Sequence, residues 1–399
     1  MTIEVELGSV AKIVAGQHIE SNLHNRDGDG VPYLTGPSDF TVSGPVVTKW
    51  TRYPRVFAQA SDTLVTVKGA GVGKSSRGVD AAIGRQLMAI RPVESRLDPS
   101  YLYVFIRSRE ADIAARAQGA TVPGVGKDDL ASLQIPLPPV DEQRRIAAIL
   151  DKADAIRQKR QEAINLVNQL LQSMFFDMFG DPLLNPKGWR KVSLDSVAVV
   201  RGGLQVTEKR SALPIEVPYL RVANVFRERL NLREVKTIRV TSSELDRTRL
   251  KKGDVLIVEG HGNPTELGRS SVWDGSIELI VHQNHLIRVE PELKQLDSVY
   301  LSYFINSAEG RRQMFGYGKT TSGLNTLSAS QVKSLMILLP PIDLQRQFAD
   351  LVAKSKMTTK KLEAGTRLAE SLGSSLVSEM FGKLVQGPDV QIEHEFNTV

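Results

Sequence analysis

The strongest constraint on this chain is an internal duplication. Residues 135–180 align without a gap with residues 337–382, with 16 identities in 46 positions. Both copies contain Leu-Pro-Pro, a Gln-Arg pair a few residues later and a closing Met-Phe-Gly. A gapless match of this length indicates a tandem repeat, and such repeats define the architecture before any local structure is assigned.

The duplication extends more weakly into the segment that precedes each copy. Val192–Ala198 resembles Val5–Ala11, and the sequence Val-Pro-Tyr-Leu occurs at both 31–34 and 217–220. Between these matched anchors the two segments differ. We therefore predict two similar globular domains with different loops, each followed by its own copy of the repeat.

The repeated segments have the pattern of long helices. From Asp141 to Phe179 there is no Pro or Gly, and apolar residues recur alternately three and four positions apart, as in a coiled-coil seam. In the second copy, Ser355, Thr359 and Gly373 weaken the seam. About 39 residues span about 58 Å as a helix, too long for one small globule to bury. This predicts an antiparallel pair of helices that spaces the two domains; the alternative is that each helix packs along its own domain.

The segments outside the repeat have the pattern of mixed α/β structure. We expect strands at 63–68, 255–259, 279–281 and 286–289, short helices at Pro99–Ser108 and Asp297–Asn306, and exposed loops at 69–78 and 259–269. The predicted fold class is therefore mixed α+β with a pseudo-two-fold repeat. The expected parts are globular domains at 1–139 and 187–341, helical spacers at 140–186 and 342–384, and a polar tail at 385–399 that we expect to be disordered.

Composition narrows the class of protein. With no cysteine, the chain has no disulfide, no Cys-ligated zinc and no thiol nucleophile. No run approaches the roughly 18 apolar residues of a membrane helix, and the N-terminal stretch lacks the basic region of a signal peptide. We therefore expect a cytoplasmic protein with no membrane partner.

Positive charge is concentrated in one part of the chain. The formal net charge is +6, and residues 187–340 carry 23 Lys and Arg against 16 Asp and Glu. A local excess of this kind suits a polyanion, because neutralised phosphates release their counterions. A solubilising surface would explain the charge equally well.

Motifs for catalysis are incomplete or missing. The stretch Gly69–Ser75 is one residue too short for a phosphate-binding P-loop. A glycine-rich turn that presents Lys74 and Arg77 to a phosphate backbone, or simply a tight turn, fits it better. His282 and His285 lie three apart in a strand-like run, so they should face opposite sides and not share a metal. We predict neither catalysis nor a bound cofactor in this chain; an unfamiliar type of enzyme is the alternative.

Several loop residues are of types that bind DNA. Arginine suits guanine edges, asparagine suits adenine, and lysine and threonine suit phosphates. The candidate DNA-binding residues are Lys74, Arg77, Arg85, Arg221, Asn224, His261, Asn263, Arg269, Lys319, Thr320 and Thr321. For any one of them, an ordinary surface or turn role is the alternative.

Taken together, these segments resemble the specificity subunit of a type I restriction–modification system. The resemblance is carried by GATVPGVGKDDLASLQIPLPPVDEQRRIAAIL at 119–150 and FGDPLLNPKGWRKVSLDSVAVVRGG at 179–203, and it is echoed at 320–347. HGNPTELGR at 261–269 and the short GVGK at 71–74 also resemble loops of the family's target domains.

The resemblance implies a non-catalytic subunit with two target-recognition domains. Each would read one half of an interrupted, asymmetric site in double-stranded DNA. The paired helices would set the gap and dock two modification (methyltransferase) subunits. S-adenosylmethionine, ATP and Mg²⁺ would be held by those partners and by restriction subunits where these are present. The alternative function is a coiled-coil interaction scaffold that does not read DNA.

Overall fold

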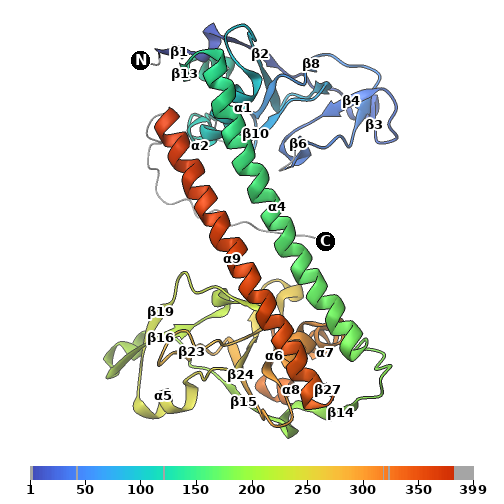
Figure 1. Cartoon of the computed structure of the whole chain (residues 1–399), viewed down its shortest axis with the longest axis vertical. Helices are drawn as coiled ribbons and strands as arrows, with labels where there is room; N and C mark the ends of the chain where they lie inside the picture. The colour runs from blue at the N-terminus through green and yellow to red at the C-terminus, as the bar shows by residue number, and fades with distance from the viewer. Residues whose placement is uncertain (1–2, 42–43, 120–121, 318, 322–323, 382–399) are drawn as a thin grey trace. The chain divides into compact units, whose positions relative to one another are not determined.

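The computed structural model describes residues 3–41, 44–119, 122–317, 319–321 and 324–381 (Figure 1). The chain forms two compact units. Unit 1 combines residues 1–161 with 363–399, and unit 2 consists of residues 162–362. Each unit therefore contains one globular α/β part together with segments of both long helices.

The globular part of unit 1 is built on two sheets. One has the strand order β10-β9-β12-β2 and the other has the order β3-β7-β4-β11-β8. The strands are β1 (Ile3–Glu6), β2 (Ala11–Ala15), β3 (His24–Asn25), β4 (Val31–Leu34), β5 (Phe40–Thr41), β6 (Gly44–Pro45), β7 (Trp50–Thr51), β8 (Phe57–Ala58), β9 (Thr63–Thr66), β10 (Ser75–Arg77), β11 (Ala81–Ile83), β12 (Leu87–Pro92) and β13 (Gln134–Leu137). The helices are α1 (Pro99–Ser108), α2 (Glu110–Ala115) and α3 (Lys127–Ala131).

Unit 2 repeats this plan. Its main sheet has the order β15-β24-β20-β22, and a second sheet has the order β19-β16-β23. The strands are β14 (Arg190–Ser193), β15 (Ala198–Gly202), β16 (Ile215–Leu220), β17 (Val225–Phe226), β18 (Arg229–Leu230), β19 (Lys236–Val240), β20 (Val255–Val258), β21 (Gly260–His261), β22 (Ser270–Val272), β23 (Val281–His282), β24 (Leu286–Pro291), β25 (Lys319–Thr321), β26 (Leu324–Thr326) and β27 (Met336–Leu339). The helices are α5 (Ser242–Thr248), α6 (Ser298–Asn306), α7 (Ala308–Tyr317) and α8 (Ala329–Lys333).

Local sequence explains the matching helices α1 and α6. The carboxylate of Asp98 accepts hydrogen bonds from the backbone nitrogens of Ser100 and Tyr101, and Asp297 does the same at the start of α6. Pro99 occupies the first position of α1, where no backbone N–H is needed. The predicted helix at Pro99–Ser108 is confirmed at both ends, and α6 begins one residue after its predicted start.

The predicted strands are largely confirmed, with one correction. β9, β20 and β24 lie where the sequence placed them. The prediction of a strand at 279–281 is wrong in its first part. β23 begins only at Val281, and Leu279 has a φ of 53°. A left-handed residue of this kind cannot continue a strand, so the chain turns before β23.

Two helices of 40 residues each, α4 (Val140–Phe179) and α9 (Ile342–Phe381), pair antiparallel (Figure 1). In unit 2 the end of α4 meets the start of α9, with the rings of Phe175 and Phe348 5.5 Å apart. In unit 1 the end of α9 joins the core at the start of α4, and Phe381 lies 5.4 Å from the ring of Tyr101. The predicted antiparallel pair is confirmed. Of the described helices, none is long and apolar enough to cross a membrane.

Candidate nucleic-acid interface

Two loops that are distant in sequence lie side by side in unit 2. β20 leads into β21, which pairs with β26, and β26 pairs with β25. His261 is opposite Asn325, and Asn325 is opposite Thr320. The backbone therefore brings the candidates His261, Lys319, Thr320 and Thr321 onto one small sheet; the side chains of the last three lie outside the described part.

Unit 1 has a corresponding pair of loops. The backbone nitrogen of Gly69 donates to the carbonyl of Pro123 at 3.0 Å, and that of Val125 donates to Val67 at 3.0 Å. Lys68 also bridges to Gly124. We call these segments the paired loops: 67–74 with 122–125 in unit 1, and 259–266 with 319–321 and 324–326 in unit 2. Each unit therefore places its glycine-rich loop against a second loop.

A glycine fixes the paired loop of unit 1 against α2. Gly73 has a φ of 92°, and a Cβ at this position would lie 2.4 Å from the carbonyl oxygen of Glu110. Only glycine meets both requirements. The next residue, Lys74, is exposed.

Arg77 does not share the exposure of Lys74. Its guanidinium lies 4.4 Å from the ring centroid of Tyr103, donates to the Ser100 hydroxyl at 3.2 Å and forms an ion pair with Asp151 of α4. These contacts join the sheet to the long helix within unit 1. Arg77 is therefore best described as a structural link.

Asn224 and Arg221 form part of a turn in unit 2. Asn224 is buried, and its amide donates to the carbonyls of Asn231 at 2.8 Å and Glu234 at 2.9 Å. Its side-chain oxygen accepts from the backbone nitrogen of Arg221 at 2.9 Å. Arg221 is partly exposed and pairs with the Glu234 carboxylate at 2.7 Å. Asn224 thus holds the turn that carries Arg221, and its own amide does not reach the surface.

Arg269 is also internal, with an exposed fraction of 6%. Its guanidinium lies 4.7 Å from the ring centroid of Phe226, pairs with Glu266 at 2.9 Å and donates to the carbonyl of Val222 at 3.0 Å. It therefore anchors the loop that contains His261 and Asn263. Asn263 is exposed, and its side-chain oxygen accepts from the backbone nitrogen of Thr265 at 3.0 Å.

A hollow in unit 1 surrounds Arg85, and no pattern in the sequence predicts it. A cavity of about 270 Å³ is lined by His18, Ile19, His24, Tyr33, Thr35, Gly84, Arg85 and Gln86. Burial, followed by the nearby charges of Lys49, His18 and Arg26, lowers the pKa of His24. The lining residues come from separate strands and turns, so no local motif marks them in the sequence.

The two histidines of 282–285 have separate surroundings. His282 is buried beside the carbonyl of Thr248 at 3.1 Å, and burial lowers its pKa to about 4. His285 lies 3.2 Å from the carboxylate of Glu259. No group of three potential metal ligands occurs within the described ranges.

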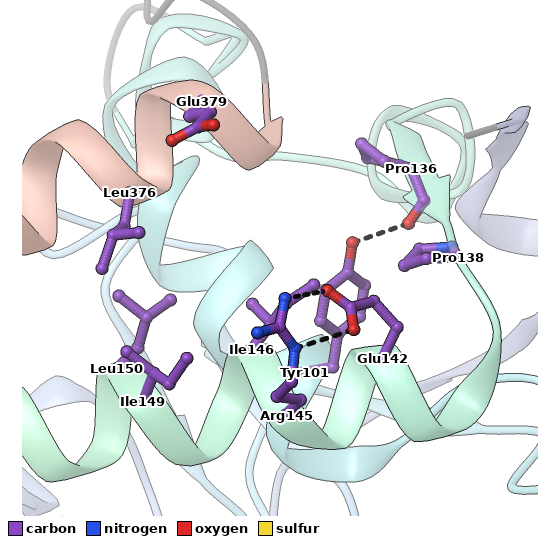
Figure 2. Close-up of a pocket in the computed structure, with 10 residues that line it drawn as sticks. All are labelled: Tyr101, Pro136, Pro138, Glu142, Arg145, Ile146, Ile149, Leu150, Leu376 and Glu379. Atoms are coloured by element: carbon purple, nitrogen blue, oxygen red, sulfur yellow. Dashed lines mark hydrogen bonds and ion pairs between the residues drawn. The ribbon is translucent and has the colours of Figure 1, made fainter. Parts of the chain in front are cut away.

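The start of α4 and the end of α9 border a second cavity in unit 1, of about 400 Å³ (Figure 2). Apolar side chains line one side, including Ile146, Ile149 and Leu376, and the Glu142–Arg145 ion pair lies on another. In unit 2 the residue that matches Ile146 in the repeat is Phe348, whose larger ring is fully buried. The two copies therefore carry side chains of different size at this buried position.

Large apolar side chains are also exposed along both long helices. They are Ile149, Ile156, Leu166, Leu170 and Phe176 on α4, and Met357, Leu368 and Leu372 on α9. Leu166 is 64% exposed and Leu368 is 63% exposed. Clusters of exposed apolar residues on a helix surface are typical of contact with another protein.

The chain belongs to the family described as type I restriction modification DNA specificity domain, which matches residues 3–166 and 186–370. One matched segment lies in each half of the duplication. The predictions of a type I specificity subunit, as opposed to a catalytic one, and of DNA target recognition as its role are confirmed by this membership.

Individual relatives agree with this assignment. The chain is 22% identical over 330 residues to the StySPI specificity subunit of Salmonella potsdam. This match covers 78% of this chain and 71% of that protein. It is 24% identical over 293 residues to the EcoKI specificity subunit of Escherichia coli strain K12, covering 67% of this chain and 61% of that protein. The latter match thus spans less than two thirds of its relative.

Solved structures show the same fold. The crystal structure of the S subunit of a type I restriction–modification system from M. genitalium has a TM-score of 0.62 at 15% identity, with 96% of this chain and 97% of that chain covered. A chain from a structural study of complex assembly and conformational transition in a type I system has a TM-score of 0.55 at 19% identity, with 96% and 98% covered.

Proposed function

We propose that the globular part of each unit reads one half of a two-part, asymmetric site in double-stranded DNA. The observation that carries this proposal is the repeated frame with unlike loops. Both units hold paired loops at the same place, yet their side chains differ. Two domains that share a backbone fold but differ in their surface side chains would recognise two different DNA sequences.

The exposed candidates are the proposed DNA contacts. Lys74 and Arg85 in unit 1, and Asn263 and the partly exposed His261 in unit 2, are accessible to a duplex. Lys319, Thr320 and Thr321 remain proposed contacts from the position of their strand. We assign Arg77, Asn224 and Arg269 to positioning because their polar groups are used inside the units, while Arg221 could contact DNA if it left Glu234.

Footprinting of the chain on DNA, in complex with its modification partners, tests this proposal. We expect two protected words separated by a fixed gap, and an affinity that falls with salt. A single protected word that tolerates changes in internal spacing would contradict it. An interaction scaffold would show no salt-dependent affinity for DNA.

We further propose that α4 and α9 set the gap between the two words. Both helices contribute residues to both units, which supports a role as a spacer. A deletion of seven residues from each helix tests this role. It is best centred on Arg160 in α4 and Gly365 in α9, because these two positions face each other: a Cβ at Gly365 would lie 3.0 Å from the guanidinium carbon of Arg160. Removing seven residues around each point shortens each helix by about 10 Å, or roughly three base pairs. The tolerated gap should shorten, and an unchanged gap would reject the spacer role.

The same helices are proposed to dock two methyltransferase subunits in the cytoplasm. Those partners would supply S-adenosylmethionine, and restriction subunits where present would supply ATP and Mg²⁺ chemistry. The exposed apolar residues on α4 support this assignment, because a free surface of that kind would gain from being covered. Leu166→Glu with Leu170→Glu should lower methyltransferase binding at least tenfold, whereas Gln169→Glu on the same exposed stretch should not. Equal binding by both variants would reject this surface.

A further inference from the structure

A three-residue turn occupies the same backbone frame in both units. Residues 84–86 join β11 to β12 in unit 1, and residues 283–285 join β23 to β24 in unit 2. Gly84 donates its backbone N–H to Leu34 at 2.8 Å, and Gln283 donates to Leu220 at 2.9 Å. The two turns are therefore anchored to matching strands, β4 and β16.

The far ends of the two turns are anchored alike as well. The carbonyl of Gln86 accepts from the backbone nitrogen of Val67 at 2.8 Å, and that of His285 accepts from Glu259 at 2.9 Å. Val67 and Glu259 are the residues at which the paired loops begin. Each turn consequently adjoins the paired loops of its own unit and extends the proposed DNA-facing surface.

The side chains of the two matching turns differ and are accessible to solvent. Arg85 and Gln86 are exposed, and among the described residues neither side chain has a hydrogen bond or ion pair. At the positions that match Arg85 and Gln86, unit 2 carries Asn284 and His285. Both are partly exposed, and His285 lies 3.2 Å from the carboxylate of Glu259. Arginine can bind a guanine edge with two hydrogen bonds, and glutamine or asparagine can bind an adenine edge in the same way.

The surroundings of the first turn favour a polyanion. Arg85 and Gln86 lie on the rim of the 270 Å³ cavity together with His18 and His24. Lys49 is close by, because its ammonium donates to the Thr35 hydroxyl of the cavity lining at 3.0 Å. Asp39 lies beside this lining, and its carboxylate is occupied by the backbone nitrogen and hydroxyl of Thr35. Arg85 and Lys49 thus place two cationic groups beside the hollow.

We propose that this turn is a base-reading element in both units. Arg85 and Gln86 would discriminate base pairs in one half-site, and Asn284 and His285, at the matching positions, would discriminate base pairs in the other. The inference rests on the proposed function, in which each unit reads one half of a two-part site. It adds the prediction that one structural position carries different base-reading residues in the two copies.

The test exchanges the turns between the units. One variant combines Arg85→Asn with Gln86→His, and the reciprocal variant combines Asn284→Arg with His285→Gln. Gly84 is left in place because a Cβ there would lie 2.9 Å from the Tyr33 hydroxyl. Each variant is assembled with the modification subunits and given a DNA library randomised in both half-sites, and the methylated molecules are sequenced. Lys12→Ala, an exposed lysine on β2, is the matched control.

Each exchange should change base preference at least tenfold at one or more positions of a single half-site. The two variants should alter opposite halves, and the gap should stay the same. Unchanged words in both halves would overturn the inference. Equal weakening of all sequences, with a smaller dependence on salt, would also overturn it by revealing contacts with phosphates alone.

A second variant separates base reading from loss of folding. Arg85→Lys keeps the charge but lacks the planar fork that binds guanine with two hydrogen bonds. It should retain salt-dependent affinity for unrelated DNA while losing preference in one half-site; full retention of that preference would contradict the role of Arg85. If the unaltered complex prefers no two-part word at all, the proposed function itself fails, independently of the turn.

Discussion

The side-chain oxygen of Gln143 accepts a hydrogen bond from the backbone nitrogen of Asp98 at 2.8 Å. The amide nitrogen of the same side chain donates to the carbonyls of Arg96 at 2.9 Å and Pro138 at 2.8 Å. One buried glutamine on the first turn of α4 therefore ties together the start of α1, the chain before it and the Pro-Pro turn. These contacts explain why glutamine occurs at this place in both copies of the repeat.

Gln345 makes the equivalent bonds in unit 2, to Asp297 at 2.8 Å, Gln295 at 3.0 Å and Pro340 at 2.8 Å. Gln345→Ala should lower the free energy of unfolding by about 2–4 kcal/mol, because it leaves buried backbone groups without partners. Gln347→Ala, on an exposed position of the same helical turn, should change it by less than about 0.5 kcal/mol. Urea unfolding of the full chain measures the free energy of unfolding of both variants. A change for Gln345→Ala as small as that for Gln347→Ala would show that the hydrogen bonds of Gln345 are dispensable.

Arg269→Ala should weaken recognition of the second half-site about tenfold or more, although the side chain is buried. The variant leaves Glu266 unpaired and removes the guanidinium from the face of Phe226, so the loop that carries His261 loses its support. Arg269→Lys should not restore recognition, because an ammonium cannot reproduce the planar contacts. Methylation of half-site variants by the assembled complex measures the effect, and unchanged preference in both variants would reject the positioning role.

Phe348→Ala should lower the free energy of unfolding by about 3–5 kcal/mol, as expected for a buried aromatic ring. The ring lies 4.9 Å from that of Tyr303 and 5.6 Å from that of Phe179, so its loss opens a cavity between α4, α6 and α9 in unit 2. Phe315→Ala is the control, since Phe315 is 64% exposed. Thermal and urea unfolding should separate the two variants clearly; similar stabilities would mean that the site repacks.

Glu228 gives unit 2 a pH-dependent stability. Burial raises the pKa of its carboxyl to about 7, although Asn306, Lys356 and Arg227 act in the opposite direction. The folded state therefore favours the protonated form. This contribution is complete below the unfolded pKa of about 4.5, and it is lost as the pH rises through about 7.

Glu228→Gln should consequently gain stability over the parent chain as the pH rises from 5 to 8, by about 1–3 kcal/mol. Glutamine resembles the protonated carboxyl and can still accept from the Asn306 amide. Glu278→Gln, at an exposed carboxyl, should follow the parent curve. Unfolding at several pH values distinguishes them, and a constant difference between Glu228→Gln and the parent would refute this account.

Much of the fold follows from local and periodic features of the sequence. The duplication and its apolar spacing predict both long helices, and Asp98 with Pro99 specifies the start of α1. The candidate site is harder to predict, because residue type does not report burial. Asn224 and Arg269 have the chemistry of DNA contacts, but tertiary packing commits them to internal bonds. The pairing of His261 with Asn325 spans 64 positions, and no local pattern encodes it.

The place of Phe381 within unit 1 constrains how the protein is made. Its ring packs on Tyr101 and Phe105, and its carbonyl accepts from Arg109 at 2.6 Å. The ribosome must therefore synthesise the chain as far as Phe381 before unit 1 can acquire this core side chain. Unit 2 consists of one continuous stretch of the chain, so it does not depend on a later segment. During synthesis unit 2 can therefore complete its core before unit 1, although its residues are synthesised later than the first segment of unit 1.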